Sequence, residues 1–384
     1  MAAIDELFRI MVEQGASDLH ITSGAAPYLR LHGNMAPLNY KELTSQDVQG
    51  LIFEILSEKQ KKQFVERWEL DCAYTLPGIG RFRCNVFMQR KGLGGVFRII
   101  PEKIRTAKEL NLPSYVMDLI DCDRGLILVT GPTGSGKSTT LASLVHHINM
   151  TRDAHIITIE DPIEFVHQNV KSLVNQREVG SHTKSFANAL KAALREDPDI
   201  MLVGELRDLE TISLALTAAE TGHVVFATLH TNSAAKTIDR IIDVFPSTQQ
   251  AQIRTMLAES LRGVIAQTLF TRADGQGRVA AYEVLKNTKA IANLIREGKI
   301  HQIASAMQTG AASGMILFEK YIDDLVKKGK VAPNDAKTFL GRTDGGNAGK
   351  DVTGPNAAVG TGKPTGGGSG NTSGGFTTGG TKAG

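Results

Sequence analysis

The hydrophobic pattern of the chain changes its period at about residue 114. Beyond that point, short apolar runs alternate with longer stretches in which apolar residues recur every three or four positions. Short apolar runs are typical of buried parallel strands, and the longer stretches are typical of helices that cover a sheet. We therefore predict strands at residues 126–129, 155–160, 200–203 and 223–229, and helices at residues 141–148, 185–195 and 209–220. This alternation predicts an α/β domain with a doubly covered parallel sheet over residues 114–287.

The first 99 residues mix short strands and helices, which predicts a smaller α+β domain. Within residues 81–90, polar positions that include Arg81 and Arg83 alternate with the apolar residues Phe82, Cys84, Val86 and Met88. A period of two predicts a strand with one apolar face and one basic face. The glycine-rich residues 92–95 are expected to form a turn, and residues 96–100 to form the returning strand of a hairpin.

Three further segments complete the predicted organisation. Residues 100–113, with a proline near each end, are expected to link the two domains. Residues 288–341 carry apolar residues at helical spacing, which predicts a C-terminal helical subdomain with two buried stripes, Ile291, Leu294 and Ile295 on one and Phe318, Ile322 and Leu325 on the other. Residues 342–384 are rich in Gly, Thr, Ser and Asn and cannot bury enough apolar surface to fold, so we expect a disordered tail.

Composition excludes several classes of function. A net charge of +3 and an aromatic content of 5% argue against a nucleic-acid partner, which would need a basic surface and stacking side chains. The first 15 residues form a charged amphipathic stretch unlike a signal peptide, and there is no apolar run of membrane-spanning length, so we expect a cytoplasmic protein. The cysteines Cys72, Cys84 and Cys122 are odd in number and are expected to be free, packed thiols.

The strand predicted at residues 126–129 leads into the sequence Gly-Pro-Thr-Gly-Ser-Gly-Lys-Ser at residues 131–138. This is a complete P-loop, whose glycines let backbone N–H groups surround phosphate while the next helix adds its positive N-terminal dipole. Lys137 is placed to reach the β- and γ-phosphates, and Ser138 to offer a hydroxyl to Mg²⁺. The sequence thus predicts a nucleoside triphosphate site made by Gly131, Pro132, Thr133, Gly134, Ser135, Gly136, Lys137, Ser138 and Thr139.

Two carboxylates are candidates for activating the attacking water. Glu205 follows the strand at residues 200–203, which we expect beside the P-loop strand, and ligands bind at the carboxyl ends of such strands. That position favours Glu205 as a Mg²⁺-linked base that binds the metal directly or through water. Glu164 follows Asp161 and Pro162 on a turn that could face the γ-phosphate from the other side. The sequence leaves the division of labour between the two glutamates open.

Two histidines bracket the strand predicted at residues 223–229. His230 lies at its carboxyl end, where it is expected to sense phosphate, and His223 lies at the opposite end. Their odd spacing of seven residues points them to opposite faces of a strand, so both cannot serve one site through the strand alone. For His223, a packing role and a role across a subunit boundary both stay open.

Three segments together resemble the secretion ATPase superfamily, which drives type II secretion and type IV pili. They are residues 194–208, the acidic box at residues 159–165 and the histidine box at residues 221–233. Residues 15–21, 80–83 and 290–297 are further similar to the branch that retracts pili. One position departs from the pattern, because Ala292 stands where that branch usually has Arg.

The resemblance implies a RecA-like P-loop core with a PAS-like N-terminal domain and Mg²⁺-dependent hydrolysis of ATP. It also implies a homohexamer at the inner-membrane base of the pilus machine, which would contact a PilC-like platform protein and act indirectly on the pilin fibre. In this family the N-terminal domain supplies arginines to the nucleotide, which implies roles for Arg83 and Arg98, with Arg81 and Arg90 next. Judged from its residues alone, this strand face would be a solvated basic surface.

Two alternatives remain beside a retraction motor. A PilU-like accessory ATPase would share the motifs, although the intact run at residues 228–234 favours the motor itself. A RecA-type nucleic-acid translocase would need a basic, aromatic-lined track that the sequence does not offer. The sequence does not decide the symmetry of the ring, or whether arginines act within one subunit or between neighbours.

Overall fold

The computed structural model describes residues 2–31, 33–100 and 103–342, and the chain divides into two compact units after Ala336. Both sheets and all helices before the last belong to the first unit. The predicted tail, apart from its first residue, lies outside the described residues.

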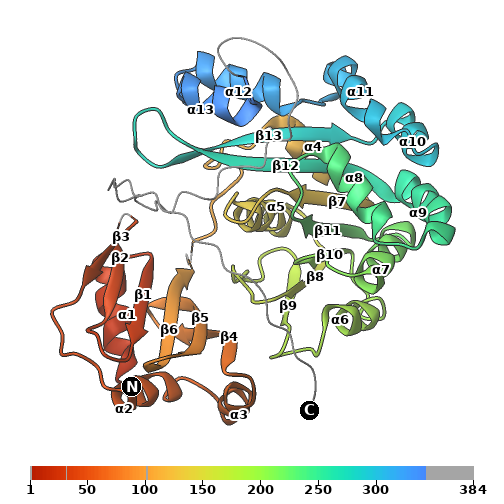
Figure 1. Cartoon of the computed structure of the whole chain (residues 1–384). Helices are drawn as coiled ribbons and strands as arrows, with labels where there is room; N and C mark the ends of the chain where they lie inside the picture. Colours follow the sequence, from red (N-terminus) through yellow and green to blue (C-terminus); the bar gives the residue numbers. More distant parts are fainter. Residues whose placement is uncertain (1, 32, 101–102, 343–384) are drawn as a thin grey trace, which may run out of the picture. The chain divides into compact units, whose positions relative to one another are not determined.

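The N-terminal part is a six-stranded sheet with three helices (Figure 1). Its strand order is β3-β2-β1-β6-β5-β4, and every neighbouring pair is antiparallel. The elements are α1 (Ile4–Glu13), β1 (Asp18–Thr22), β2 (Tyr28–Leu31), β3 (Asn34–Pro37), α2 (Ser45–Phe53), α3 (Glu58–Arg67), β4 (Glu69–Leu76), β5 (Gly80–Gln89) and β6 (Gly92–Ile100).

The predicted alternation along β5 is confirmed over most of the strand. Phe82, Cys84 and Val86 are fully buried in one cluster with residues of α1, α2 and α3, because a strand sends alternate side chains to the same face. Phe82 stacks on Phe8 of α1 with ring centroids 4.2 Å apart. Met88 was expected to continue this face, but it is 43% exposed.

The predicted turn at residues 92–95 is wrong, because these residues already belong to β6 and the chain reverses at Arg90 and Lys91. The glycines serve close packing. A Cβ on Gly95 would lie 2.8 Å from the ring of Phe97, and one on Gly94 would lie 3.1 Å from the ring of Phe87. Glycine-rich sequence therefore marks an aromatic contact here and not a loop.

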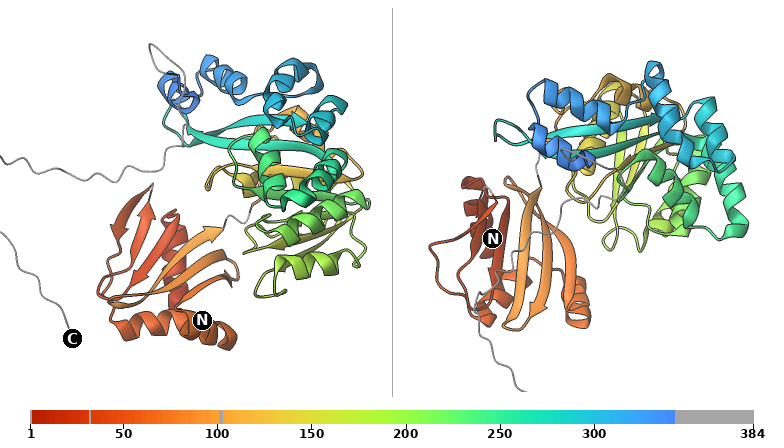
Figure 2. Two further views of the ribbon diagram at one scale, coloured as in Figure 1. Left: turned by 45° about the vertical axis from the view of Figure 1, so that its right-hand side comes forward. Right: turned by 45° about the horizontal axis from the view of Figure 1, so that its top comes forward.

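The second sheet has seven strands in the order β13-β12-β7-β11-β10-β8-β9 (Figures 1 and 2). All neighbours are parallel except the hairpin of β12 and β13 at one edge. The elements are α4 (Ser114–Ile120), β7 (Gly125–Thr130), α5 (Lys137–Thr151), β8 (His155–Glu160), β9 (Leu173–Glu178), α6 (Phe186–Ala193), β10 (Ile200–Val203), α7 (Leu209–Glu220), β11 (Val224–Leu229), α8 (Ala234–Asp243), α9 (Ser247–Ser260), β12 (Leu261–Thr271) and β13 (Arg278–Lys286).

Both faces of this sheet are buried, which confirms the predicted α/β class with a doubly covered sheet. Along β7, Leu126 and Leu128 pack in the cluster that contains α6 to α10, whereas Ile127 and Val129 pack with α4 and α5. A strand buried on both faces is continuously apolar, which explains why the sequence showed runs and no alternation here. Strand β9, helices α8 and α9 and the β12–β13 hairpin were not predicted.

Residues 289–340 are helical, as predicted, and comprise α10 (Lys289–Arg296), η1 (Ile300–Gln302), α11 (Ile303–Thr309), η2 (Gly310–Ser313), α12 (Phe318–Lys327) and α13 (Pro333–Leu340). Ile291 and Ile295 are fully buried and Leu294 is partly buried, which confirms the first stripe. Ala292, at the position where Arg is usual, is 8% exposed and packs in the same core. Among the helices of the described ranges, none combines the length and apolar surface that crossing a bilayer requires.

We predict that Phe82→Ala destabilises the N-terminal sheet by about 3–5 kcal/mol, because it removes a fully buried ring that stacks on Phe8. Urea unfolding followed by circular dichroism measures the change. Met88→Ala on the same strand is the matched control, and should cost less than about 1 kcal/mol because the side chain is exposed. Equal losses in the two variants would contradict the assignment of the buried face.

Candidate functional site

The loop after β7 has the backbone geometry of a phosphate cradle. Gly131, Gly134 and Gly136 have φ values of 147°, 79° and 90°, which residues with a Cβ rarely adopt. A Cβ on Gly131 would lie 2.2 Å from the carbonyl oxygen of Gln267, so the loop also has no room for a side chain there. Helix α5 begins directly at Lys137, and its N-terminal N–H groups and dipole therefore face the loop.

Lys137 is folded back onto its own loop. Its Nζ donates to the carbonyl oxygens of Gly131 at 2.8 Å and Pro132 at 3.1 Å. Burial lowers the pKa of Lys137, while the charges of Glu205 and Glu164 act to raise it. Both candidate carboxylates therefore lie within electrostatic reach of the P-loop lysine, and the structure brings these three predicted residues together.

Glu205 follows the carboxyl end of β10 and has two basic neighbours. Its Oε2 lies 2.7 Å from Nη2 of Arg207, and its Oε1 lies 3.4 Å from Nε2 of His230. Burial acts to raise the pKa of Glu205, but the hydrogen bond from Arg207 and the charges of Arg207, His230 and Lys137 outweigh it, so the pKa is lowered. This carboxylate is held ionised beside the P-loop.

The order of the strands differs from the order predicted around Glu205. Strand β10 was expected beside the P-loop strand β7, but β11 lies between them. The neighbour of β7 is thus the strand that ends before His230. All these strands are parallel, so their carboxyl ends still meet at one edge of the sheet and bring His230 and Glu205 to the P-loop edge.

Glu164 lies on the loop after β8, and its side chain is 40% exposed. Its Oε1 is 3.9 Å from Nη1 of Arg83, which is the arginine of β5 that was expected to reach the nucleotide. Arg81 of the same strand pairs with Glu178 at 2.6 Å. The structure thus brings Arg83 and Glu164 together.

Arg98 has a different partner. Its Nε donates to Oδ1 of Asp18 at 2.7 Å, and Asp18 is its register neighbour on β1. Arg30 also approaches this buried aspartate, at 3.7 Å. In this structure Arg98 is engaged within the N-terminal sheet, and within the described residues it makes no hydrogen bond or ion pair with the P-loop or with either glutamate.

The ring of His223 contacts residues close to it in the sequence, whereas its carbonyl oxygen accepts from Gly125 N at 2.9 Å. Its Nδ1 is 3.0 Å from the carbonyl oxygen of Ala218 and 3.3 Å from Oγ1 of Thr221, so the ring covers the end of α7. It precedes β11, whereas His230 follows it. The two histidines therefore lie at opposite edges of the sheet, as their positions in the sequence predicted.

Gln267 of β12 supports the P-loop and was missed by the motif analysis. Its Oε1 accepts from Oγ1 of Thr140 at 2.7 Å, and its Nε2 donates to the carbonyl oxygen of Ser135 at 2.7 Å. The side chain thereby ties the loop and the first turn of α5 to the neighbouring strand. The only signal in the sequence was a glutamine, followed by Thr268, within a mostly apolar run.

Three polar side chains in and beside the acidic box were also missed. Gln176 and Glu178 were missed because β9 was not predicted, and Glu160, inside the box, had been given no role. Glu160, Gln176 and Glu178 project from β8 and β9 toward the loop that carries Glu164. Burial raises the pKa of Glu160 to about 7, against the opposing effect of hydrogen bonds from Thr158, Gln176 and the Glu164 amide.

The residues present fit a nucleoside triphosphate with Mg²⁺. The glycine cradle leaves open space at Gly134, and Oγ of Ser135 is buried there without a partner in the described residues. The Ser138 hydroxyl and the Glu205 carboxylate are oxygen ligands of the kind that Mg²⁺ prefers. The described residues contain no group of three or more His, Cys, Asp or Glu side chains that could bind a metal ion by themselves. Mg²⁺ bound with a nucleotide needs only one or two protein ligands, because the phosphates supply others.

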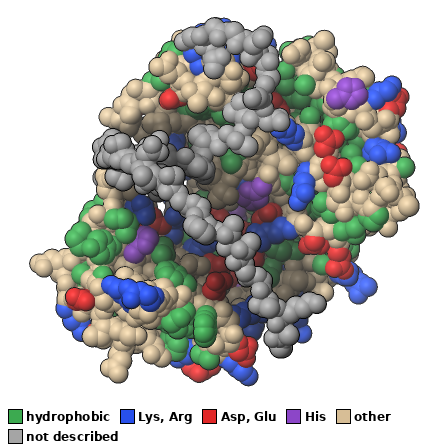
Figure 3. Space-filling view, viewed as in Figure 1, with side chains coloured by type: hydrophobic (Ala, Val, Ile, Leu, Met, Phe, Trp, Pro, Cys, Tyr) green, Lys and Arg blue, Asp and Glu red, His purple; other side chains and the backbone are tan. Residues whose placement is uncertain are grey.

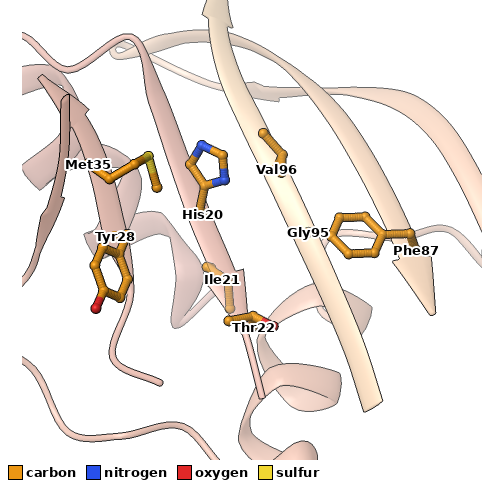
Figure 4. A pocket seen from close by; sticks show the side chains of 8 residues that line it. All are labelled: His20, Ile21, Thr22, Tyr28, Met35, Phe87, Gly95 and Val96. Atoms are coloured by element: carbon orange, nitrogen blue, oxygen red, sulfur yellow. The ribbon is translucent and has the colours of Figure 1, made fainter. Parts of the chain in front are cut away.

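Two hollows lie away from this site. One of about 560 Å³ adjoins Cys122 and Arg124, just before β7, and so lies at the opposite end of that strand from the P-loop. The other, of about 350 Å³, lies on the N-terminal sheet between His20, Tyr28, Met35 and Phe87 (Figure 4). Neither hollow includes a P-loop residue or a candidate carboxylate. On the face shown in Figure 3, acidic and basic side chains are interspersed.

Comparison with known proteins identifies the family. Residues 106–329 match the family of type II/IV secretion system proteins. The chain is 53% identical to the type IV pilus retraction ATPase PilT of Pseudomonas aeruginosa over 87% of this chain and 97% of that protein. It is 51% identical to a twitching motility protein of Neisseria gonorrhoeae over 84% of this chain and 87% of that protein.

Solved structures agree with this assignment. A crystal structure of the pilus retraction motor PilT with bound ADP matches with a TM-score of 0.82 and 48% identity, over 90% of this chain and 98% of that one. The ATPase DotB of Legionella pneumophila matches with a TM-score of 0.79 and 28% identity, over 88% of this chain and 95% of that one. The chain is therefore a nucleotide-binding ATPase that belongs to the type II/IV secretion ATPase family, among its pilus retraction ATPases.

Proposed function

We propose that this ATPase powers the retraction of type IV pili as a Mg²⁺-dependent homohexamer at the cytoplasmic side of the inner membrane. The observation that carries the mechanism is the meeting of Lys137, Glu205, His230 and Glu164 at one edge of the parallel sheet. Identity to PilT is 53%, against 40% to the related pilus ATPase PilU of Pseudomonas aeruginosa, which favours the motor over an accessory ATPase.

Lys137 and Ser138 would hold the phosphates and the metal. In this structure the ammonium group of Lys137 is occupied by two carbonyl oxygens of its own loop, and we propose that it exchanges these for the β- and γ-phosphates when ATP is bound. Bound Mg²⁺ supplies positive charge to the phosphate oxygens. Ser138 would bind it with its hydroxyl, and Glu205 directly or through water.

The surroundings of the two glutamates suggest how they divide the work. Glu205 is ionised and held by Arg207 and His230, which suits a fixed charge near a metal. Glu164 is more exposed, and its ion pair with Arg83 is long, at 3.9 Å, so its carboxylate has an oxygen available to accept a proton from water. We therefore propose that Glu164 activates the attacking water, that Glu205 binds Mg²⁺ directly or through water, and that His230 senses the phosphate.

Arg83 would compensate the charge that develops on the γ-phosphate. It contacts Glu164 of its own chain, so we propose that it acts within one subunit. Arg98 would join it only by leaving Asp18. Movement of a domain of residues 1–99 against one of residues 114–287, through the linker 100–113, would deliver or withdraw Arg83 and pass motion to a PilC-like platform protein.

We predict that Glu164→Gln and Glu205→Gln both lower the kcat for ATP hydrolysis by about 10²-fold or more, because each removes a carboxylate that hydrolysis needs. Only Glu205→Gln should also require more Mg²⁺ for half-maximal rate. A Mg²⁺ titration of steady-state phosphate release measures both effects. Lys137→Ala should abolish nucleotide binding while its melting temperature stays near that of wild type. An unchanged Mg²⁺ requirement in Glu205→Gln would reverse the assignment of the two glutamates.

We predict that Arg83→Ala lowers kcat on the order of 10³-fold, as loss of a charge-compensating arginine does in other P-loop enzymes. Arg83→Ala subunits mixed with Lys137→Ala subunits should stay inactive at every ratio, because an arginine that acts within its own subunit leaves each subunit with its own defect. Arg90→Ala is the control for loss of one charge from the same hairpin. Recovery of hydrolysis in mixed rings would show that Arg83 serves a neighbouring subunit.

The pilus assignment itself is tested in cells that lack this chain. We predict that they carry excess surface pili and do not twitch, and that wild-type protein restores retraction whereas Glu164→Gln does not. Microscopy of labelled pili measures retraction directly. Normal retraction in the deletion strain would leave the accessory role or a different cargo as the function.

A further inference from the structure

The loop that carries Glu164 is unusual in how its backbone is held. Within the described residues, no main-chain group of residues 161–168 is hydrogen-bonded to another main-chain group. Loops commonly hold their shape through turns closed by such bonds. The position of Glu164 must therefore depend on side chains that reach this segment from elsewhere.

Those side chains come from β8 and β9, which are parallel neighbours. Thr158 and Gln176 are register partners, and so are Glu160 and Glu178, so all four lie on one face of the two strands. Three of them bind the loop backbone. The bonds run from Ile163 N to Glu178 Oε2 at 3.1 Å, from Glu164 N to Glu160 Oε2 at 3.4 Å, from Gln176 Nε2 to Phe165 O at 2.8 Å and from His167 N to Gln176 Oε1 at 2.7 Å.

The three side chains are themselves fixed. Oε1 of Glu160 accepts from Oγ1 of Thr158 at 2.6 Å and from Nε2 of Gln176 at 3.2 Å. Oε1 of Glu178 accepts from Oγ of Ser181 at 3.0 Å. Glu178 is 5% exposed and Thr158 is fully buried, so these two groups give up water for their bonds, whereas Glu160 and Gln176 are half-buried. A network whose members are all paired specifies one arrangement.

We propose that Glu160, Gln176 and Glu178 form a polar clamp of positioning residues for ATP hydrolysis. The clamp fixes the main chain of residues 163–167 and thereby sets the distance between the carboxylate of Glu164 and the P-loop lysine. None of the three bonds to the P-loop within the described residues. Glu160 and Gln176 act only through the loop that carries Glu164, whereas Glu178 also pairs with Arg81. The inference rests on the role of Glu164 in hydrolysis proposed above.

The clamp should control the rate and not the affinity. Lys137 and the glycine cradle lie on β7, α5 and the loop between them, and no bond of the clamp reaches those elements. Binding of ATP should thus survive when the clamp is broken. A displacement of about 1 Å at a group that acts on the reacting water can cost about 10²-fold in rate. The expected signature is a loss of kcat with an unchanged KM.

The first experiment compares Gln176→Ala with Asn175→Ala. Gln176→Ala removes two bonds to the loop, whereas Asn175 lies one residue earlier on β9 and contacts Nε2 of His155. We expect Gln176→Ala to lower kcat about 10- to 100-fold with KM for ATP within about twofold, and Asn175→Ala to leave both unchanged. Hydrogen exchange by mass spectrometry should show faster exchange over residues 162–168 in Gln176→Ala alone.

The second experiment uses Glu160, for which a conservative variant exists. Glu160→Gln keeps an oxygen that can accept from the Glu164 amide, and its NH₂ group can donate to Oγ1 of Thr158, so it loses only the bond from Nε2 of Gln176. Glu160→Ala keeps none of these bonds. We expect Glu160→Gln to retain at least about half of wild-type kcat and Glu160→Ala to behave like Gln176→Ala. Loss of kcat in both variants, with exchange raised throughout the sheet, would mean that Glu160 only stabilises the fold, and the proposal would be wrong.

The outcomes also separate this inference from the role of Glu164. If Glu164→Gln turns over ATP like wild type, the role of Glu164 is wrong, whatever the clamp variants do. If Glu164→Gln is inactive but Gln176→Ala keeps wild-type kcat and exchange over residues 162–168, the clamp is wrong. If both the role of Glu164 and the clamp are correct, the double variant Glu164→Gln/Gln176→Ala should hydrolyse ATP no more slowly than Glu164→Gln alone. The reason is that Gln176 acts on hydrolysis only through Glu164.

Discussion

The parallel pairing of β7, β11, β10 and β8 is the constraint on which the rest of the site depends. Because these strands run in one direction, each delivers the residue that follows it to the same edge of the sheet. The P-loop, His230, Glu205 and the acidic box thus meet although they are spread over some hundred residues of sequence. Burial of the sheet on both faces makes this edge rigid.

At that edge, acidic and basic side chains lie near one another and shift one another's pKa values. Lys137 is bound to the carbonyl oxygens of its own loop. Its burial lowers its pKa, and the charges of Glu205 and Glu164 act to raise it. Glu205 in turn is kept ionised by Arg207 and His230 against the cost of its burial. Because these charges are already in place without a ligand, a bound phosphate can replace the loop carbonyl oxygens as the partner of Lys137 with little rearrangement.

The N-terminal sheet contributes through its basic strand face, and its arginines have divided tasks. Arg98 neutralises the buried Asp18 within the sheet, whereas Arg81 and Arg83 pair with acidic residues on and after the strands of the second sheet. Arg81 and the polar clamp share Glu178, whose Oε2 accepts from both Arg81 and the amide of Ile163. The loop that carries Glu164 is therefore connected to both sheets.

The sequence by itself determined the fold class, the P-loop and the acidic and histidine positions, because each rests on local rules: apolar runs, required glycines and residues that follow a strand. Only the tertiary structure decided which strands are neighbours, and so that β11 separates β10 from β7. Gln267 and Gln176 were missed because a glutamine in a strand belongs to no motif, and its importance comes from the backbone that packing brings to it. The turn predicted at residues 92–95 was wrong for the same reason, because the aromatic rings that leave no room for a side chain at Gly94 and Gly95 are contacts of the folded sheet.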